Sequence, residues 1–262
     1  WCGYPLDKRI FPWNHANCGD LNLSGERRPQ SYLRETLWSD APVSHIVVTP
    51  PVPSFPLNPD KADWSVWDFP DVVDHWNFPG YEGKKMTVSV YSNCEQVELF
   101  LNGESLGKQE NTADKKNTLV WEVPYAHGIL KAVSYNKGGE VGTATLESAG
   151  KVEKIRLSAD RTEIVADGND LSYITLELVD SKGIRNQLAE ELVAFSIEGD
   201  ATIEGVGNAN PMSIESFVAN SRKTWRGSNL LVVRSGKSSG RIIVTAKVKA
   251  LPVASITITQ KK

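Results

Sequence analysis

Residues 86–103 read MTVSVYSNCEQVELFLNG, and this stretch decides the fold. Apolar and polar side chains alternate over Met86–Tyr91 and again over Gln96–Leu101, which is the pattern of strands that bury one face. Asn102-Gly103 follows directly, and this dipeptide is preferred in two-residue hairpin turns because both positions take a positive φ. The stretch therefore predicts antiparallel strands joined by a tight turn.

Short runs of the same type continue along the chain. In the first half they lie at Leu119–Val123, Ile129–Tyr135 and Val141–Leu146, with Gly138-Gly139 as a second tight turn. A second series, beginning near Val152, comprises Ile155–Leu157, Tyr173–Val179, Val193–Ile197, Ala201–Glu204, Leu230–Arg234, Ile242–Val248 and Ile256–Thr259. Turn signals at residues 167–170 and 180–183 give roughly ten-residue spacing. The sequence therefore predicts a mainly β protein with two immunoglobulin-like β-sandwich domains.

One short helix is predicted over residues 29–38. Pro29 suits the first helical turn, where its missing N–H costs nothing. The apolar face is formed by residues at helical spacing, namely Tyr32, Leu33, Thr36 and Leu37. No other stretch shows helical periodicity of this strength, so we expect this helix to pack on a partner that is missing or truncated. We expect Glu35, on the same helix, to be a surface charge.

A proline-rich segment separates this helix from the sandwiches. Six of the fourteen prolines fall between residues 42 and 59, where they remove N–H donors and favour extended backbone. We therefore predict four regions: an N-terminal segment over 1–41, a linker over 42–59, a first sandwich over 60–149 and a second over 151–262. The linker contains the apolar residues Ile46, Val47, Val48 and Phe55, which indicate that it packs across a neighbouring surface.

Three blocks of sequence carry a family resemblance. The first is Asn14–Asp20 with Arg28–Trp38, the second His75–Lys84 with Val88–Gly107, and the third Gly205–Pro211 through Arg222–Gly227. In order and spacing they closely resemble the C-terminal part of family 2 glycoside hydrolases, specifically the β-galactosidase-like members of Bacteroides-type bacteria. The resemblance implies that residues 1–41 are a loop-and-helix remnant from the end of a (β/α)8 catalytic barrel, and that two accessory sandwiches follow it.

The resemblance also bears on catalysis. Retaining glycosidases need two carboxyl groups about 5 Å apart, and in this family both come from barrel glutamates upstream of the matching segment. We therefore assign no catalytic residue to this chain. The family's loop lies near the active-site end of the barrel, so Trp13 and His15 are candidates for the rim of the sugar pocket. A β-linked oligosaccharide would bind through the missing barrel of the parent, whose sugar could be a galactoside, a glucuronide or a mannoside. The resemblance suggests export to the bacterial periplasm or cell surface.

Three further groups of polar residues have both a functional and a simpler interpretation. His15, Cys18 and Asp20 could form a nucleophilic site, but no orienting group or oxyanion device accompanies them. An acidic run could supply calcium ligands, although it lacks the spacing of an EF-hand loop; it comprises Asp60, Asp63, Asp68, Asp71 and Asp74. The four histidines are too widely spaced to indicate a zinc site. We expect no metal and no cofactor.

Aromatic residues and cysteines leave further alternatives. Trp64, Trp67 and Trp76 are more consistent with packing at a domain junction than with a platform for sugars. Tyr173 and Trp225 could form a sugar-stacking pair, though a buried tryptophan is the commoner outcome. Cys2 and Cys18 could form a disulfide, whereas small buried thiols are the simpler interpretation.

Gly205-Val206-Gly207-Asn208 superficially resembles a phosphate-binding loop. The lysine and the serine or threonine that such a loop requires are missing, and we expect a turn in which glycine takes positive φ.

Charge and hydropathy exclude two classes of partner. The net charge of −3 provides no broad basic surface for nucleic acid. The apolar runs are far shorter than the roughly 20 residues of a membrane-spanning helix, so we expect no membrane insertion. A free-standing carbohydrate-binding or adhesion module remains the alternative to a region of a larger glycosidase.

Overall fold

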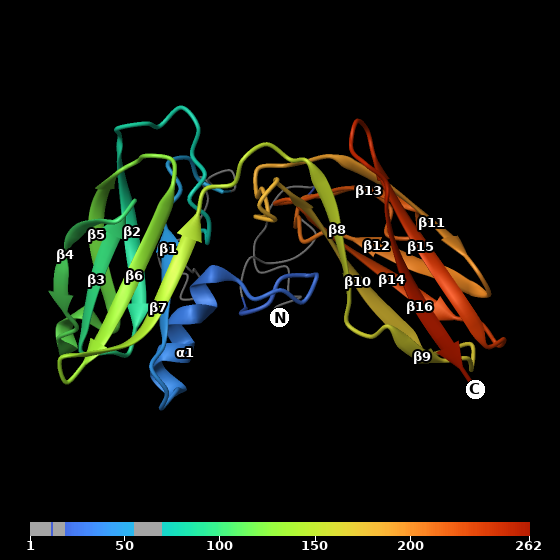
Figure 1. The fold of residues 1–262 in the computed structure, drawn as a ribbon, viewed down its shortest axis with the longest axis horizontal. Coiled ribbons are helices and arrows are strands. Elements are labelled where there is room, and N and C mark those ends of the chain that lie inside the picture. Colours follow the sequence, from blue (N-terminus) through green and yellow to red (C-terminus); the bar gives the residue numbers. More distant parts are fainter. Residues whose placement is uncertain (1–11, 13–18, 55–69) are drawn as a thin grey trace. The chain divides into compact units, whose positions relative to one another are not determined.

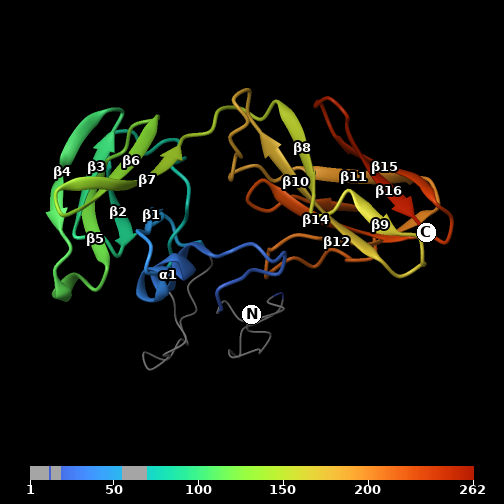
Figure 2. The same ribbon diagram turned by 60° about the horizontal axis from the view of Figure 1, so that its bottom comes forward.

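The computed structural model describes residue 12, residues 19–54 and residues 70–262. This part of the chain is mainly β and forms two compact units, which divide between Ser148 and Ala149. Each unit consists of two sheets that enclose a separate apolar core. The expected fold class, β-sandwich domains after a short helix, is confirmed. Figures 1 and 2 show the strands of the two units.

The first unit combines a three-stranded and a four-stranded antiparallel sheet. The three-stranded sheet has the order β1-β2-β5, with β1 at Ser44–Val48, β2 at Lys85–Ser92 and β5 at Thr118–Pro124. The four-stranded sheet has the order β4-β3-β6-β7, with β3 at Gln96–Leu101, β4 at Glu104–Glu110, β6 at Ile129–Asn136 and β7 at Gly139–Glu147. A 3-10 turn, η2, at Ala113–Lys115 precedes β5.

The predicted hairpin between β3 and β4 is present. Asn102 and Gly103 have φ values of 52° and 87°, so both occupy the left-handed region that this turn requires. The hairpin between β6 and β7 differs by one residue from the expected Gly138-Gly139 turn. Lys137 and Gly138 take the positive φ values instead, and Gly139 is the first residue of β7.

Part of the expected linker is a strand of the first sandwich. The structure places β1 inside the 42–59 segment, where its residues pair with β2 from Ser44↔Ser92 to Val48↔Val88. The backbone groups of Val48 also exchange hydrogen bonds with those of Val73. Ile46, Val47 and Val48 are buried, so the burial of these side chains overrides the tendency of the surrounding prolines to interrupt a sheet.

The helix lies against this same sheet. The 3-10 turn η1, at Pro29–Ser31, leads into α1 at Tyr32–Trp38, beside β1 and β2 in both views (Figures 1 and 2). Tyr32 and Leu33 pack on a small cluster formed by Val47, Val72 and Tyr91. The helix therefore has a partner within the first unit, contrary to the expectation that its partner is missing or truncated. Its last two residues, Leu37 and Trp38, are exposed.

Trp76 forms part of the core of the first unit. Its side chain is fully buried, and its Nε1–H donates to the carbonyl oxygen of Ala126 at 2.8 Å. The rings of Phe78 and Tyr125 meet it edge-on. The expected role at a domain junction is therefore wrong for Trp76, which fills a single domain's interior; Trp64 and Trp67 lie outside the described residues.

The second unit combines a four-stranded and a five-stranded sheet. The first has the order β12-β14-β10-β8, with β8 at Lys154–Ala159, β10 at Leu171–Val179, β12 at Ala201–Gly207 and β14 at Ser228–Ser235. The second has the order β13-β11-β15-β16-β9, with β9 at Glu163–Val165, β11 at Leu192–Glu198, β13 at Ser221–Lys223, β15 at Gly240–Val248 and β16 at Ala254–Lys261. The β9–β16 pair is parallel.

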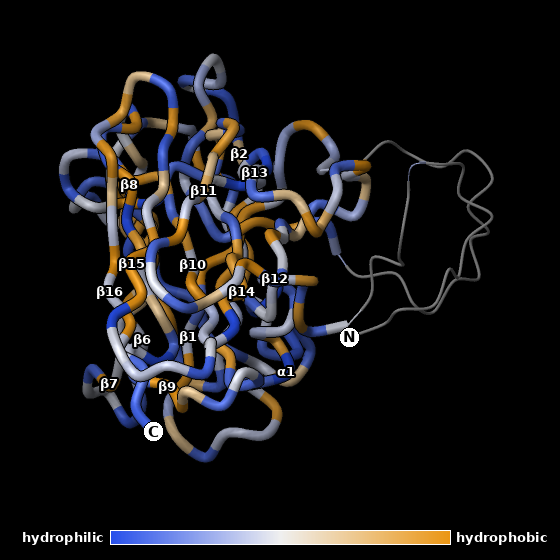
Figure 3. The backbone as a smooth tube through the Cα atoms, turned by 90° about the vertical axis from the view of Figure 1, so that its right-hand side faces the viewer, coloured by the Kyte–Doolittle hydropathy of each residue, from blue (hydrophilic) through white to orange (hydrophobic). Residues whose placement is uncertain are grey.

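Alternating side chains fill the core of the second unit. Ile174, Leu176 and Leu178 of β10 are fully buried, as are Leu231 and Val233 of β14. Figure 3 shows hydrophobic residues concentrated along β10 and β14. These strands lie side by side in one sheet, so their inward-facing residues form a continuous apolar layer.

One buried carboxylate organises the start of the second unit. The Asp180 carboxylate accepts hydrogen bonds from the backbone N–H groups of Gly150, Lys182 and Ile184 at 2.8–2.9 Å. Burial alone would raise the pKa of Asp180, but these donors outweigh it and lower the pKa below its ordinary value. Asp180 therefore binds the turn predicted at 180–183 to the segment that enters β8.

Candidate functional site

Many of the sequence-predicted site residues lie outside the described residues. This applies to Trp13 and His15, to Cys2 and Cys18, and to Asp60, Asp63 and Asp68 of the acidic run. Of the rest of that run, Asp71 accepts a hydrogen bond from the backbone N–H of Ser54 at 2.7 Å. Within the described part of the chain, no group of three or more His, Cys, Asp or Glu residues could hold a metal ion.

A pocket of about 240 Å³ lies beside helix α1 in the first unit. Its lining comes from α1, β1, β6, β7 and the connecting segments, and comprises Glu35, Pro42, Val43, Ser44, His45, Cys94, Ser134, Gly142 and Thr143. Polar groups gathered in a concave site are the usual starting point for a functional hypothesis. The pocket is therefore the candidate functional site of the first unit.

Glu35 is the centre of a polar cluster at one side of this pocket. Its Oε2 accepts a hydrogen bond from Arg27 Nη1 at 2.6 Å and lies 3.1 Å from His45 Nε2. The imidazole of His45 stacks on the Tyr32 ring, with centroids 4.1 Å apart and planes 11° from parallel. The Arg27 guanidinium lies 4.7 Å from the centroid of the same ring.

The cluster perturbs both titrating groups. The hydrogen bond and charge of Arg27 lower the pKa of Glu35, and His45 acts in the same direction. Burial lowers the pKa of His45; the nearby Glu35 carboxylate opposes this shift without reversing it. Near neutral pH the cluster therefore contains an ionised Glu35 and a neutral His45.

Sequence patterns give no sign of this cluster. Glu35 was expected to be a surface charge, yet its carboxylate is bound by two side chains. Arg27 precedes the helix, and His45 belongs to a strand within a segment expected to be a linker. The cluster exists because α1 packs on β1, a tertiary contact that periodicity within either segment does not report.

The two serines that line the pocket, Ser44 and Ser134, belong to a hydrogen-bonded network that also includes Ser92. Ser44 Oγ lies 2.8 Å from Ser92 Oγ and 2.5 Å from Ser134 Oγ. Ser92 Oγ donates to the carbonyl oxygen of Val43, and the backbone N–H of Cys94 donates to Ser92 Oγ. Such a network ties β1 to β2 and β6. It does not resemble the nucleophile–base pair that an activated serine or cysteine requires.

The chemistry available at this pocket is limited. Glu35 is the single carboxylate among the described residues that line it. Retaining hydrolysis of a glycoside needs two carboxyl groups about 5 Å apart, one of them as acid and one as nucleophile. The cluster instead matches a structural anchor, in which a hydrogen bond between Glu35 and His45 joins helix to sheet and the Arg27–Glu35 ion pair supports it.

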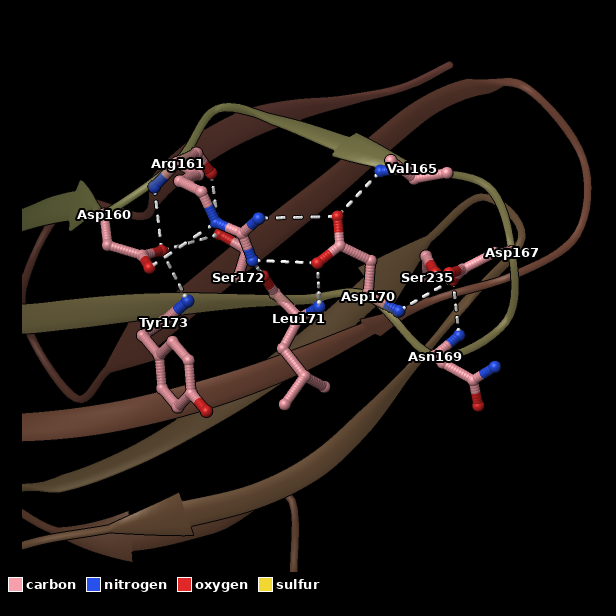
Figure 4. Close-up of polar contacts among 10 residues, drawn as sticks. All are labelled: Asp160, Arg161, Val165, Asp167, Asn169, Asp170, Leu171, Ser172, Tyr173 and Ser235. Atoms are coloured by element: carbon pink, nitrogen blue, oxygen red, sulfur yellow. Dashed lines mark hydrogen bonds and ion pairs between the residues drawn. The ribbon is translucent and has the colours of Figure 1, made fainter. Parts of the chain in front are cut away.

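The second unit has an acidic cluster, shown in Figure 4. Asp170 accepts hydrogen bonds from Arg161 and from the backbone N–H of Val165, and Asp167 accepts them from the backbone N–H groups of Asn169 and Asp170. These donors lower the pKa of both carboxyls. The carboxylate oxygens of Asp167 therefore stabilise the turn predicted at 167–170, and those of Asp170 bond the backbone at the end of β9.

The proposed stacking pair Tyr173 and Trp225 is not brought together. Tyr173 pairs with Val232 of β14, whereas Trp225 forms a bridge with Ser228, four residues away on that strand. Four residues of strand correspond to about 13 Å. The Arg226 guanidinium also lies 4.6 Å from the Trp225 ring centroid and covers one of its faces. The two rings therefore do not form a single sugar platform.

Comparison with known proteins agrees with this division into two domains. Residues 155–257 match the family model of glycoside hydrolase family 2 C-terminal domain 5, and residues 83–142 match a domain of unknown function, DUF4982. A solved family 2 glycosyl hydrolase from Bacteroides cellulosilyticus superimposes with a TM-score of 0.89 and 96% identity, over 94% of this chain and 32% of that chain.

Curated relatives have two different activities in their names. The beta-galactosidase BoGH2A of Bacteroides ovatus is 30% identical over 253 residues, which are 96% of this chain and 26% of the relative. A beta-glucuronidase of Formosa agariphila is 30% identical over 205 residues, covering 76% of this chain and 20% of the relative. Both relatives are bacterial.

The second β-sandwich matches a domain model that is specific to the C-terminal region of one class of enzymes, the family 2 glycoside hydrolases. The chain belongs to glycoside hydrolase family 2 and corresponds to a C-terminal part of its members. It spans about a quarter of the B. ovatus relative and a third of the B. cellulosilyticus chain. In the described residues, no helix is both long and apolar enough to cross a membrane.

Proposed function

We propose that this chain is the non-catalytic C-terminal region of a retaining β-glycosidase that acts in carbohydrate breakdown. The observation that carries the proposal is the match of residues 155–257 to the family 2 C-terminal domain model. The geometry of the first unit supports it, because the pocket beside α1 offers one carboxylate, which is already bound by Arg27 and His45. The role of both sandwiches is then architectural.

We propose a β-galactoside as the substrate of the whole protein. The named beta-galactosidase relative aligns with 96% of this chain, whereas the named beta-glucuronidase aligns with 76%. Trp13 and His15 remain the proposed rim of the sugar pocket, and export to the periplasm or cell surface remains the proposed location. Each of these is a property of the whole polypeptide.

The direct test compares the 262-residue chain with the full-length polypeptide that contains it. Both are incubated with nitrophenyl β-galactoside, β-glucuronide and β-mannoside. The full-length polypeptide should release nitrophenol from the galactoside, and the isolated chain should release none above buffer. A rate that scales with the concentration of the isolated chain would contradict the non-catalytic role, and His15→Ala and Cys18→Ala would then locate the activity.

A further inference from the structure

The connection between β12 and β13 exposes an apolar patch. Within five residues, Ile214 is 72% exposed, Phe217 48% and Val218 83%. We refer to these three residues as the 214–218 patch. Monomeric proteins expose single apolar residues freely, whereas exposed apolar residues that gather in one place are a feature of interaction surfaces.

The loop that carries the patch is held in one conformation by a buried arginine. Arg222 of β13 is fully buried, and its guanidinium donates to the carbonyl oxygens of Val206 and Glu215 and to Ser213 Oγ at 2.9–3.2 Å. The backbone N–H of Lys223 donates to the Glu215 carboxylate at 3.0 Å. The exposed side chains therefore sit on a preorganised scaffold, which reduces the entropy lost when a partner binds.

A glycine allows the loop to pack against the sheet. The backbone N–H of Val206 donates to the carbonyl oxygen of Phe217 at 2.8 Å. A Cβ atom added at Gly205 would lie 3.1 Å from that oxygen, tighter than ordinary van der Waals contact. Gly205 and Gly207 belong to β12, so the positive-φ turn expected there is wrong; Gly205 is suited to the close approach of the loop.

The chemistry of the patch indicates a protein surface as its partner. Sugars bind proteins by stacking on open aromatic faces, but the Arg222 guanidinium lies 4.2 Å from the Phe217 ring centroid and covers one face. Ile214 and Val218 offer only aliphatic groups. The carboxylate of Glu215, between Ile214 and Phe217 in the sequence, is bound by Ser213 and by the N–H of Lys223. The patch is therefore suited to an apolar protein surface.

From these observations we infer that the 214–218 patch docks the second sandwich onto the part of the family 2 polypeptide that lies outside this chain. The inference rests on the proposed function, because that polypeptide must be present. Relatives are three to four times the length of the matched region, since it covers 26% of one and 32% of another. The occupant is thus covalently linked and has a high effective concentration at the patch.

Hydroxyl-radical footprinting read by mass spectrometry tests the inference. Oxidation of Ile214, Phe217 and Val218 should fall several-fold in the full-length polypeptide compared with the isolated 262-residue chain. Val253, which is 58% exposed in the turn between β15 and β16, is the internal control and should be oxidised equally in both. Equal oxidation of the patch in both proteins, or an equal fall at Val253, would overturn docking at this patch.

Variants separate docking from folding. Because the side chains are exposed, Ile214→Ser with Val218→Ser should leave the thermal midpoint of the isolated chain unchanged. In the full-length polypeptide this double substitution should restore oxidation of Phe217, whereas Val253→Ser should not. Protection that appears in the isolated chain as its concentration rises would assign the patch to a second copy and overturn the inference. Protection in a full-length polypeptide without glycosidase activity would support docking and contradict the proposed function.

Discussion

His45 Nε2 lies 3.1 Å from Glu35 Oε2, and this contact joins strand β1 to helix α1. The two residues are ten positions apart and occupy different types of secondary structure. The same carboxylate oxygen accepts a hydrogen bond from Arg27. One acidic side chain therefore connects the segment before the helix, the helix itself and the sheet. We therefore expect the packing of α1 on the first sandwich to depend on the charge state of this group of residues.

Acidification should loosen α1. Because burial lowers the pKa of His45 in the folded protein, the unfolded state binds the proton more readily. The contribution of neutral His45 to stability is present above its ordinary pKa of about 6.5 and is lost as the pH falls through the lower pKa of the folded state. The lowered pKa of Glu35 adds a second loss below about pH 4.5.

Hydrogen exchange of the α1 amides, corrected for intrinsic rates, measures this effect. Their protection should decrease between about pH 7 and pH 5. His45→Phe retains a ring to stack on Tyr32 and should remove the pH dependence in this range. His127→Asn, at an exposed histidine of the same unit, should leave it unchanged. Protection of α1 that stays constant in the wild-type chain would contradict the role of His45.

Loss of the Asp180 carboxylate should destabilise the second unit. Asp180→Ala leaves the N–H groups of Gly150, Lys182 and Ile184 without their acceptor, at a cost of about 2–4 kcal/mol in the free energy of unfolding. Urea denaturation followed by circular dichroism measures this cost. Glu190→Ala, at an exposed carboxylate nearby in sequence, should change the free energy by less than about 0.5 kcal/mol. Equal effects of the two variants would exclude a specific role for Asp180.

Arg222 should be required for the conformation of the 208–220 loop. Arg222→Met fills a similar length with apolar atoms but removes the donors to Val206, Ser213 and Glu215, so we expect a loss of about 2–4 kcal/mol. Hydrogen exchange should accelerate at the loop before it does in β10 or β14. Arg241→Met, at an exposed arginine of β15, provides the matched control. An unchanged loop in Arg222→Met would show that other contacts suffice to hold it.

Truncation of Trp76 should affect one unit selectively. Trp76→Ala removes a fully buried ring and the hydrogen bond to Ala126, which costs about 3–5 kcal/mol. Because the two units have separate cores, scanning calorimetry should show the transition of the first unit at a lower temperature and that of the second unchanged. A matching shift of both transitions would indicate that the two units unfold as one.

The strands that could be predicted from sequence are those that bury alternate side chains. Val88 and Val90, or Ile174 and Leu176, point into a core, and their alternation with polar residues is visible without a structure. β9 and β13 escaped prediction because each has three residues, too few to establish a period. β1 was hidden by the prolines around it, although its apolar residues correctly indicated packing against a neighbour.

The candidate site was less accessible to sequence reasoning. Glu35 and His45 meet through tertiary packing, and neither belongs to a motif. Trp76 illustrates the same difficulty, since composition identifies a large aromatic residue but not the core in which it lies. Arg222 belongs to one of the sequence blocks that carry the family resemblance, yet its burial and its four contacts depend on a loop whose path no local pattern specifies.

Strand β4 also escaped prediction, because most of its side chains are exposed and the apolar alternation is absent. It pairs with β3 on one side and forms an edge of its sheet. Its other side presents backbone groups that could recruit a strand from another molecule, and charged residues such as Glu104, Lys108 and Glu110 discourage such pairing. The polar side chains that leave β4 without a recognisable strand pattern thus protect the protein against edge-to-edge aggregation.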